Sequence, residues 1–471
     1  MAADDDFDVI IIGSGSGNSL IGPEMDDWRI ALVERWTFGG TCLNRGCIPS
    51  KMLIFPADRA QEAGDSSHLG ISTSFNGADW PAIVKRVFGR IDPIAEGGRQ
   101  YRHSNHNVTV FEADAKFVGE RQIDVGGRVI TARQIVLATG ARSYIPPIPG
   151  LEAVGYHTSD TILRIEELPK HLIVLGGGFI AAELGHVFRS LGSRVTMINR
   201  SDRLLSAEDH SVGVAFTDVA SERFDLHLGA MVERVERVAG GIAVHILDAH
   251  GSHVVEGDQL LVAAGRLPNG DQIDADLAGV RVGPTGAVVV DEFGRTTAPG
   301  VWALGDVNGR HQLKHMANGE ARVIRHNLLN PQNLRRFDDR PAPHAVFTNP
   351  QIGAIGPTEQ HLRSAGAHFT TITQQYAHAA YGWAMEDCTG FIKLIGEPAS
   401  RTLIAAHVFG HEASILVQLL VQGMHLGSTV DEMAKGQVWI HPSLAEVVEQ
   451  ALLSLIDAFD RSEPAVVPVT Q

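Results

Sequence analysis

Two short apolar runs, each followed at once by a glycine-rich turn, constrain the fold of this chain more than any other feature. Residues Asp8–Ile12 lead into GSGSGNS, and Leu172–Leu175 lead into GGGFIAAE. A continuous apolar run is typical of a strand buried on both faces of a parallel sheet. Glycines after such a strand let backbone N–H groups approach a pyrophosphate at a helix start. The sequence therefore predicts an α/β chain with two Rossmann-like dinucleotide-binding units.

The first unit departs from the usual pattern at its helix. Its turn carries Gly13, Gly15 and Gly17, and an acid suited to ribose hydroxyls, Glu34, follows about twenty residues on. The third glycine of GxGxxG is replaced by Asn18, and the following stretch contains Gly22 and Pro23. Glycine and proline both disfavour a helix interior. We expect a short or broken first helix.

The second unit carries a clue to its nucleotide. Its turn fits GxGxxA through Gly176, Gly178 and Ala181, and its second strand ends at Asn199–Arg200, with Arg203 close by. An acid at this strand end is typical of NAD binding, whereas arginine suits the 2′-phosphate of NADP. We therefore favour NADPH, with Arg200 and Arg203 as phosphate ligands. The alternative is that both are solvated surface arginines.

A closely spaced cysteine pair, Cys42 and Cys47, lies in the stretch GGTCLNRGCIPSK. A bridge across so short a loop adds little stability, so the pair is better interpreted as redox chemistry. Pro49 favours a helix start nearby, which would place Cys47 at a positive helix end and Lys51 one turn further on. A structural disulfide, two buried free thiols or half of a metal site are the alternatives.

The stretch GGTCLNRGCIPSK resembles the redox-active loop of the flavin-dependent pyridine-nucleotide disulfide reductases. That resemblance implies that Cys47 lies nearer the flavin, that Cys42 is the outer thiol, and that Lys51 pairs with Glu183 beside the flavin ring. TTAPGVWALGD resembles the second FAD motif of the family, in which Asp306 holds the ribityl chain. The helix beginning at LKHMA would point at the flavin; His315 lies there, without a catalytic role.

The resemblance extends to a full set of cofactor ligands. For FAD the expected residues are Gly13, Gly15, Gly17, Glu34, Thr41, Lys51, Gly140, Gly305, Asp306, His315 and Ala317. For NADPH they are Gly176, Gly178, Ala181, Arg200, Arg203 and Gly265, with Phe179 where related enzymes often have a tyrosine over the nicotinamide pocket.

An acid–base pair is expected near the C-terminus. His441 and Glu446 stand in WIHPSLAEVVE, which resembles the family's catalytic His–Glu pair. An imidazole titrates in the range that disulfide exchange needs, and a carboxylate fixes its tautomer. In the family this pair reaches the cysteine loop of the other subunit, which implies a homodimer. The alternative is a histidine that caps a helix before Pro442.

Four segments follow from these motifs. Residues 1–150 are expected as the FAD-binding domain with the cysteine pair, 151–270 as the NADPH-binding domain, 271–340 as the second part of the FAD-binding domain, and 341–471 as the dimerisation domain. The last segment alternates strand-like and helical runs without a glycine-rich turn, so we expect an antiparallel sheet with helices. The residues from Arg461 to Gln471 are expected as a loose tail.

Composition excludes several function classes. The formal net charge of −16 disfavours a nucleic-acid partner. The start, MAADDDFDVI, lacks the features of a signal peptide, and no apolar run approaches a membrane span. We therefore expect a cytoplasmic protein, in which a cysteine pair cycles rather than stays oxidised.

Within the family, the chain resembles the mycothione reductases across nearly its whole length. The supporting stretches include GSGNS, FGGTCLN, LKHMAN and AYGWAMEDCTG. The tail carries no cysteine pair, which disfavours mercuric reductases and high-molecular-weight thioredoxin reductases. Asn199 stands where dihydrolipoamide dehydrogenases would prefer an acid. Pro23 and Glu24 stand where glutathione reductases place arginines for the substrate. We expect an enzyme that reduces mycothione. For Tyr381 and Trp383 we expect core packing rather than stacking on a sugar of the substrate. The alternatives are glutathione reductase, dihydrolipoamide dehydrogenase, a soluble transhydrogenase and a non-catalytic flavin redox sensor.

Overall fold

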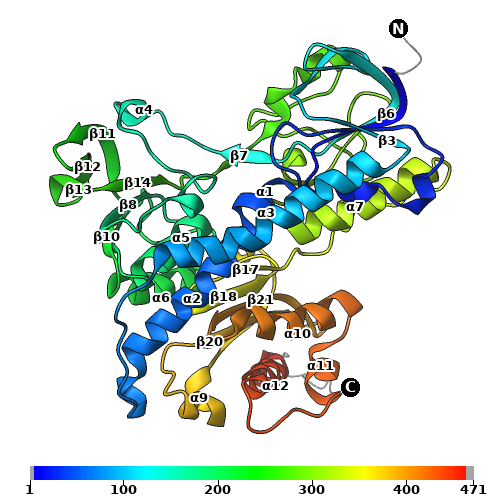
Figure 1. Cartoon of the computed structure of the whole chain (residues 1–471). Helices are drawn as coiled ribbons and strands as arrows, with labels where there is room; N and C mark the ends of the chain where they lie inside the picture. Colours follow the sequence, from blue (N-terminus) through cyan, green and yellow to red (C-terminus); the bar gives the residue numbers. More distant parts are fainter. Residues whose placement is uncertain (1–4, 463–471) are drawn as a thin grey trace, which may run out of the picture.

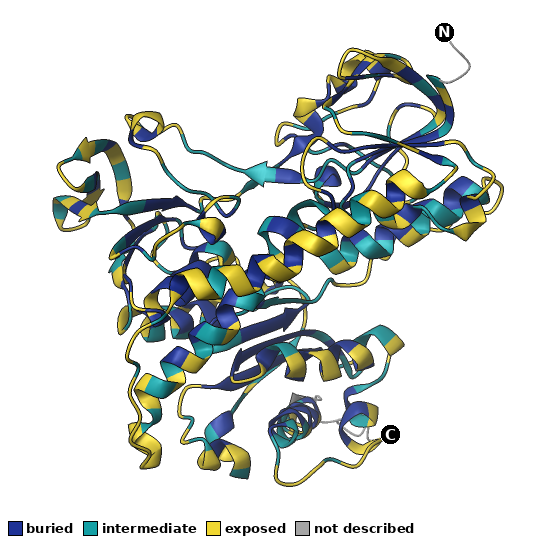
Figure 2. Cartoon of the chain, in the orientation of Figure 1, coloured by how far each residue is buried: buried dark blue, intermediate teal, exposed yellow. Residues whose placement is uncertain are grey.

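A computed structural model describes residues 5–462 of the chain. Two α/β bodies and one antiparallel body make up the molecule, and two long helices, α2 and α3, run between them (Figure 1). The central strands of each main sheet are buried, whereas the long helices expose one side to solvent (Figure 2). The expected fold class, two Rossmann-like units with a C-terminal α+β body, is confirmed.

The first body is built on a mostly parallel sheet. Its strands are β3 (Val108–Phe111), β2 (Ile30–Val33), β1 (Asp6–Ile12), β6 (Val129–Leu137), β5 (Gln122–Val125) and β4 (Ala115–Gly119), in that spatial order. The strand β16 (Val301–Ala303) comes from much later in the chain and pairs with β6 in parallel. The chain therefore returns to complete this body after building the second one.

The first glycine-rich turn is followed by no α-helix, as expected. Two 3₁₀ turns, Gly17–Leu20 and Pro23–Met25, take its place. One residue of the first turn is held from outside: the buried Arg102 of α3 (Trp80–Ser104) donates to Asn18 Oδ1 at 2.6 Å and to the Asn18 carbonyl oxygen at 3.0 Å. Asn18, which replaces the third glycine, is thus an acceptor for a side chain that holds the shortened segment.

The second body has a fully parallel sheet of β10 (Asp225–His227), β9 (Arg194–Ile198), β8 (His171–Leu175) and β14 (Gln259–Val262). The helix α5 (Phe179–Ser190) follows β8, and α6 (His210–Ser221) follows β9. An antiparallel meander of β11 (Met231–Val238), β12 (Gly241–Asp248) and β13 (Gly251–Gly257) covers one side. A two-stranded ribbon of β7 (Ala141–Ser143) and β15 (Arg266–Pro268) connects the two bodies.

The third body is antiparallel, as the sequence predicts. Its sheet has the order β17 (His344–Val346), β18 (Gln351–Ile355), β21 (Thr402–Gly410), β20 (Phe391–Glu397) and β19 (Thr370–Gln375). The helix α10 (Ala413–Leu426) packs on β18 and β21, and α12 (Ala445–Ser462) packs on β19 and β20. Of the expected loose tail, Arg461 and Ser462 end α12, and residues 463–471 lie outside the described part.

The helix α2 (Cys47–Asp65) packs against α5 of the second body. One apolar cluster includes Leu53 and Ala57 of α2, Trp80 of α3, and Ala181 and Phe188 of α5. Because α2 begins at Cys47, this packing fixes the cysteine loop at the junction of the first and second bodies. No helix within residues 5–462 is long and apolar enough to cross a membrane.

Candidate active site

The cysteine loop folds as two consecutive helices. The short helix α1 (Gly40–Arg45) carries Cys42, and α2 begins at Cys47. The turn before α1 requires glycine because Gly39 has φ 95°, and a Cβ on it would lie 2.4 Å from Leu43 Cδ2. The predicted helix start at the second cysteine is present, with Pro49 in its first turn. Cys47 therefore stands at the positive end of a long helix.

The two cysteines are free thiols that interact with each other. The hydrogen bond from Cys42 and the charge of Lys51 lower the pKa of Cys47 to about 7, against the effect of burial. The same hydrogen bond, burial and the charge of Cys47 raise the pKa of Cys42 above its usual range. The pair therefore loses its first proton near neutral pH, and Cys47 is the thiol that ionises first.

Lys51 forms the predicted ion pair. Its Nζ lies 2.8 and 2.7 Å from the two carboxylate oxygens of Glu183 on α5. The backbone N–H of Phe347 donates to Glu183 Oε1 at 3.0 Å, and the Phe347 ring lies 4.7 Å from the ammonium. The side chain of Glu183 is 6% exposed, so this carboxylate is buried. Through these contacts it joins the second and third bodies to the cysteine helix.

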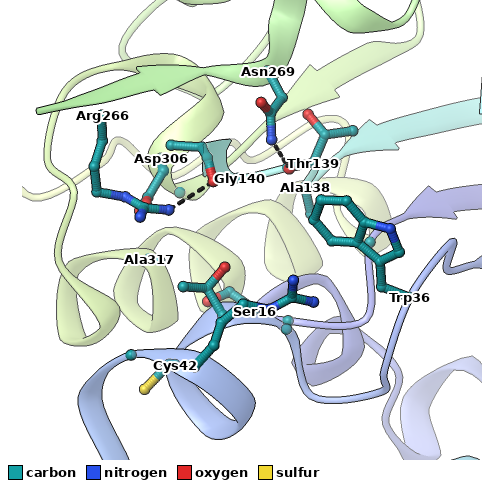
Figure 3. A pocket seen from close by; sticks show the side chains of 18 of the residues that line it. Ser16, Trp36, Cys42, Ala138, Thr139, Gly140, Arg266, Asn269, Asp306 and Ala317 are labelled. Atoms are coloured by element: carbon teal, nitrogen blue, oxygen red, sulfur yellow. Dashed lines mark hydrogen bonds between the residues drawn. The ribbon is translucent and has the colours of Figure 1, made fainter. Parts of the chain in front are cut away.

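A cavity of 640 Å³ opens beside the two thiols. In Figure 3, Cys42 lies toward one end of it and Trp36 toward the other, with Asp306 and Ala317 opposite the cysteine helix. Most of the residues expected to bind FAD line it: Gly13, Gly15, Glu34, Thr41, Lys51, Gly140, Gly305, Asp306 and Ala317.

Two of the expected FAD residues do not line this cavity. Gly17 packs underneath the turn, where a Cβ would lie 2.9 Å from Ala138 Cβ and from Ile11 Cγ2. His315 is exposed, and its Nε2 lies 2.9 Å from the Pro343 carbonyl oxygen. The first is a packing glycine, and the second turns away toward the third body.

The glycine-rich turn makes a cradle at the cavity wall. A Cβ on Gly13 would lie 2.3 Å from the Ala138 carbonyl oxygen, and a Cβ on Gly40 would lie 2.8 Å from Gly15 Cα. Glu34 is held at this wall because its carboxylate accepts hydrogen bonds from Ser14 N and Oγ, at 2.9 and 2.7 Å, and from Trp36 N at 2.9 Å. The close backbone approach leaves room for a ligand along the turn.

Two buried hydroxyl groups of the cavity lining have no protein partner. Thr139 Oγ1 and Ser159 Oγ are inaccessible to solvent and make no hydrogen bond within the described residues. A buried hydroxyl without a partner costs free energy, so such groups point to a ligand that supplies one. Both fit an extended polar cofactor in this cavity.

The opposite wall contains polar residues that sequence reasoning missed. Arg266 donates to the Ala141 carbonyl oxygen at 2.7 Å, and Asn269 Nδ2 donates to the Thr139 carbonyl oxygen at 2.9 Å (Figure 3). Burial raises the pKa of Asp306, against the charge of Arg266. The buried Glu320 accepts from Gly305 N at 2.7 Å and so holds the segment that carries Asp306. No local motif marks these contacts, because their partners lie far apart in sequence.

The second glycine-rich turn has the same construction. Gly176 has φ 128°, and a Cβ on it would lie 2.3 Å from the Ala263 carbonyl oxygen. Gly178 precedes α5 with open space around it, Ala181 is buried within α5, and Gly265 has φ 127°. Phe179 is 48% exposed and lines the cavity from the side of this turn.

The two candidate phosphate arginines differ. Arg200 is exposed and makes no hydrogen bond or ion pair within residues 5–462. The Arg203 side chain is only 20% exposed, its Nη1 lies 3.3 Å from Asp202 Oδ1, and its buried Nε has no partner in the described chain. Asn199 Nδ2 donates to the Arg203 carbonyl oxygen at 2.9 Å and shapes this loop. Arg200 is therefore available to an incoming anion, whereas Arg203 is turned inward.

His441 and Glu446 form the expected pair, with Nδ1 and Oε1 2.6 Å apart. Glu446 also accepts from Ser443 N at 3.1 Å, and these hydrogen bonds lower its pKa. The His441 side chain is 72% exposed, and neither residue is among those that line the cavity of this chain. The pair is oriented but stands apart from the thiols of its own chain.

The core-packing interpretation of two aromatic residues is wrong. Tyr381 is 43% exposed and Trp383 is 65% exposed, because both lie on the short helix α9 (Ala380–Ala384) at the surface. Cys388 follows this helix and is also exposed.

Comparison with known proteins places the chain in a family. Residues 7–321 match the model "Pyridine nucleotide-disulphide oxidoreductase", and residues 342–452 match the dimerisation domain of the same family. The chain belongs to the pyridine nucleotide-disulphide oxidoreductases. Members of this family use a flavin and a pyridine nucleotide, which agrees with two glycine-rich turns and one cysteine pair in the chain.

Curated relatives of this oxidoreductase cover nearly all of it. It is 46% identical over 460 residues to mycothione reductase of Mycobacterium tuberculosis, covering 95% of this chain and 99% of that one. It is 32% identical to mercuric reductase of Streptomyces lividans, covering 94% and 95%. Among solved structures, the flavoprotein disulfide reductase RclA from Escherichia coli matches with a TM-score of 0.83 and 29% identity, covering 97% of this chain and 100% of that one.

Proposed function

We propose that this protein reduces mycothione, the disulfide of mycothiol, with NADPH as electron donor, FAD as bound cofactor and the Cys42–Cys47 pair as redox centre. The observation that carries the reaction type is a thiolate-forming cysteine at a helix start, beside Lys51 and a thiol partner, at one end of a cavity with a dinucleotide cradle. The likeness to a mycothione reductase at 46% identity supports the substrate.

The cavity fits FAD. The cradle at Gly13 and Gly40, the carboxylate of Glu34 and the unpartnered hydroxyls of Thr139 and Ser159 are suited to its pyrophosphate, ribose and polar edges. Asp306 would accept from its ribityl chain. When bound, FAD supplies the transfer of two electrons from NADPH to the cysteine pair.

The second unit is proposed to hold NADPH. Gly176 and Gly178 would approach its pyrophosphate, and Arg200 would contact the 2′-phosphate. Phe179 lies between this turn and the main cavity, where it would cover the nicotinamide. On this proposal residues 1–150 and 271–340 form the FAD-binding domain, 151–270 the NADPH-binding domain and 341–471 the dimerisation domain.

The proposed steps on the protein balance as follows. Two electrons and two protons convert the Cys42–Cys47 disulfide into two thiols. Cys42 gives up its proton and attacks one sulfur of the substrate disulfide; the proton goes to the departing sulfur, which releases the first thiol and leaves a mixed disulfide. Cys47 then gives up its proton and its thiolate attacks the Cys42 sulfur; this second proton goes to the other departing sulfur, which releases the second thiol and restores the Cys42–Cys47 disulfide.

The acid–base group for these steps is proposed to be His441 of a second copy of the chain. In its own chain, His441 is exposed and does not line the thiol cavity. The exposed apolar residues Val438 (97%) and Ile440 (74%) precede it, which suits a surface that is covered in a homodimer.

A cysteine pair that cycles between thiol and disulfide suits the reducing cytoplasm, where we place the protein.

The test is NADPH consumption by the purified holoprotein with mycothione, glutathione disulfide and lipoamide in parallel. Fast turnover with mycothione alone is expected. Turnover with glutathione disulfide or lipoamide instead would retain the mechanism and overturn the substrate. Reduction of the flavin without turnover of any disulfide would favour a redox sensor.

A further inference from the structure

The loop that carries His441 joins two helices of the third body. This histidine loop, residues 436–444, runs from the end of α11 (Val430–Lys435) to the start of α12 (Figure 1). The His441 side chain is exposed, so packing of the imidazole itself does not hold the loop. The contacts of the other loop residues therefore decide where the imidazole stands.

Trp439 anchors the histidine loop to α11. Its Nε1 donates to the Ala434 carbonyl oxygen at 2.8 Å. Ala434 lies in the last turn of α11, where carbonyl groups lack a partner within the helix. The half-buried indole also packs against the apolar core of the third body, a cluster that includes Met433 and Leu444. A hydrogen bond and apolar contacts thus fasten the same side chain.

The neighbours of Trp439 face the opposite way. Val438 is 97% exposed and Ile440 is 74% exposed. Successive side chains of an extended segment point to opposite sides, so an inward Trp439 turns both neighbours outward. Gln437 Nε2 donates to the Met433 carbonyl oxygen at 3.3 Å, but this side chain is exposed. Among the described residues of the loop that precede His441, only Trp439 both packs on the core and bonds to α11.

The other end of the histidine loop is held by the start of α12. Ser443 N donates to Glu446 Oε2 at 3.1 Å, and Ser443 Oγ donates to the Ile440 carbonyl oxygen at 2.8 Å. Glu446 Oε1 lies 2.6 Å from His441 Nδ1. Glu446 therefore sets the orientation of the imidazole. Trp439, two residues before His441, sets the position of the backbone from which the imidazole extends.

We propose that Trp439 is a positioning residue for the acid–base histidine, because its indole fastens the backbone before His441 to α11. Disulfide exchange needs the proton donor within hydrogen-bonding distance of the departing sulfur. A displacement of about 1 Å can cost about 10²-fold in rate. The inference rests on the proposed role of His441 toward the thiols of a second copy of the chain.

Hydrogen–deuterium exchange of the holoprotein tests the anchor. Trp439→Phe keeps an aromatic ring and removes the N–H donor. Peptides that cover residues 436–446 are expected to exchange about fivefold faster than in the wild type, while the rest of the chain keeps its rates. Trp302→Phe is the matched control, because Trp302 Nε1 donates to Gln134 Oε1 at 2.7 Å in the first body. This control is expected to leave the histidine loop at its wild-type rates.

Stopped-flow kinetics test the consequence for His441. The reduced holoprotein is reoxidised with mycothione, and the reduction of its flavin by NADPH is recorded separately. Trp439→Phe is expected to slow reoxidation about tenfold and to leave flavin reduction unchanged. A general loss of structure would slow both half-reactions alike. His441→Asn, in the same assay, measures the contribution of the histidine itself.

The outcomes separate the anchor from the proposed function. Wild-type exchange around His441 in Trp439→Phe, faster exchange with unaltered reoxidation, or equal slowing of both half-reactions would each overturn the inference. Wild-type reoxidation in His441→Asn would refute the role of the histidine, and the inference with it, in a variant that keeps Trp439. A wild type that mycothione does not reoxidise would overturn the substrate, whereas the exchange measurement uses no disulfide and still tests the anchor.

Discussion

Lys51 on α2 donates to both carboxylate oxygens of Glu183 on α5, at 2.8 and 2.7 Å, and so joins the cysteine helix to the second body. Phe347 of the third body donates to the same carboxylate. All three bodies therefore meet one turn away from Cys47. A small shift between bodies would move the charge that stabilises the thiolate, so their packing and the chemistry of Cys47 are coupled.

Replacement of Lys51 tests this coupling. Lys51→Met removes the positive charge that lowers the pKa of Cys47, and we expect that pKa to rise by about one unit from its value of about 7. The thiolate then forms only in more alkaline solution. The measurement is a pH titration of the ultraviolet thiolate absorbance in the reduced protein, with Cys47→Ser to identify the titrating group. An unchanged midpoint would contradict the assignment of Lys51.

The interface between the second and third bodies contains a buried ion pair whose removal is expected to be costly. Lys393 Nζ lies 2.7 Å from Asp209 Oδ1, with side chains 7% and 0% exposed. Lys393→Met leaves the Asp209 carboxylate without this partner and is expected to lower the free energy of unfolding by about 3–5 kcal/mol. Urea unfolding of the wild type and of the variant measures this difference in the free energy of unfolding. The exposed Lys435, which pairs with Asp431 along one helix, is the matched control, and Lys435→Met is expected to cost less than about 0.5 kcal/mol.

The same pair predicts a pH dependence. Burial raises the pKa of Asp209, but hydrogen bonds from Lys393 and Ser211 outweigh it and hold this pKa far below its ordinary value. A depressed carboxyl pKa stabilises the fold above the unfolded value and loses that contribution as pH falls below it. The stability gap between wild type and Lys393→Met is therefore expected to narrow below about pH 4. A gap that widens in acid would contradict this.

Arg200 and Arg203 are expected to respond differently to substitution. Arg200 is exposed without a partner, so Arg200→Met should raise the KM for NADPH about tenfold and leave the KM for NADH unchanged. Arg203 is turned inward against Gly213, so Arg203→Met should lower the melting temperature and change the KM for NADPH and the KM for NADH by the same factor. Steady-state kinetics with each nucleotide and a melting curve make the distinction. Equal effects of Arg200→Met on NADPH and NADH would rule out a 2′-phosphate contact.

Glu446 is expected to act only through His441. Glu446→Gln removes the charge that orients the imidazole at 2.6 Å, and disulfide turnover should fall about 10²-fold. Reduction of the flavin by NADPH should keep its rate, because that half-reaction does not need the histidine. Stopped-flow kinetics separate the two half-reactions. Slower flavin reduction in the variant would place Glu446 outside the proposed role.

The sequence predicted those parts of the site that depend on local patterns. The helix start at Cys47 and the broken helix after Gly17 follow from short motifs. The Lys51–Glu183 and His441–Glu446 pairs were predicted from the resemblance to the family, and the first of them joins residues 132 positions apart. The contacts of Arg266 and Glu320 could not be predicted, because each depends on which distant backbone group or side chain the fold brings within hydrogen-bonding distance. The exposed positions of Tyr381 and Trp383 were missed for a similar reason, since a short helix of apolar residues has the same pattern at a surface as in a core.

The central claim is that the Cys42–Cys47 pair passes electrons from NADPH to mycothione. The most direct measurement compares mycothione-dependent NADPH oxidation by the wild-type protein and by Cys42→Ser, with flavin reduction monitored in both. The account predicts rapid turnover in the wild type, and a variant whose flavin is reduced by NADPH while turnover falls to background. Full activity of Cys42→Ser would contradict the account and would favour a transhydrogenase.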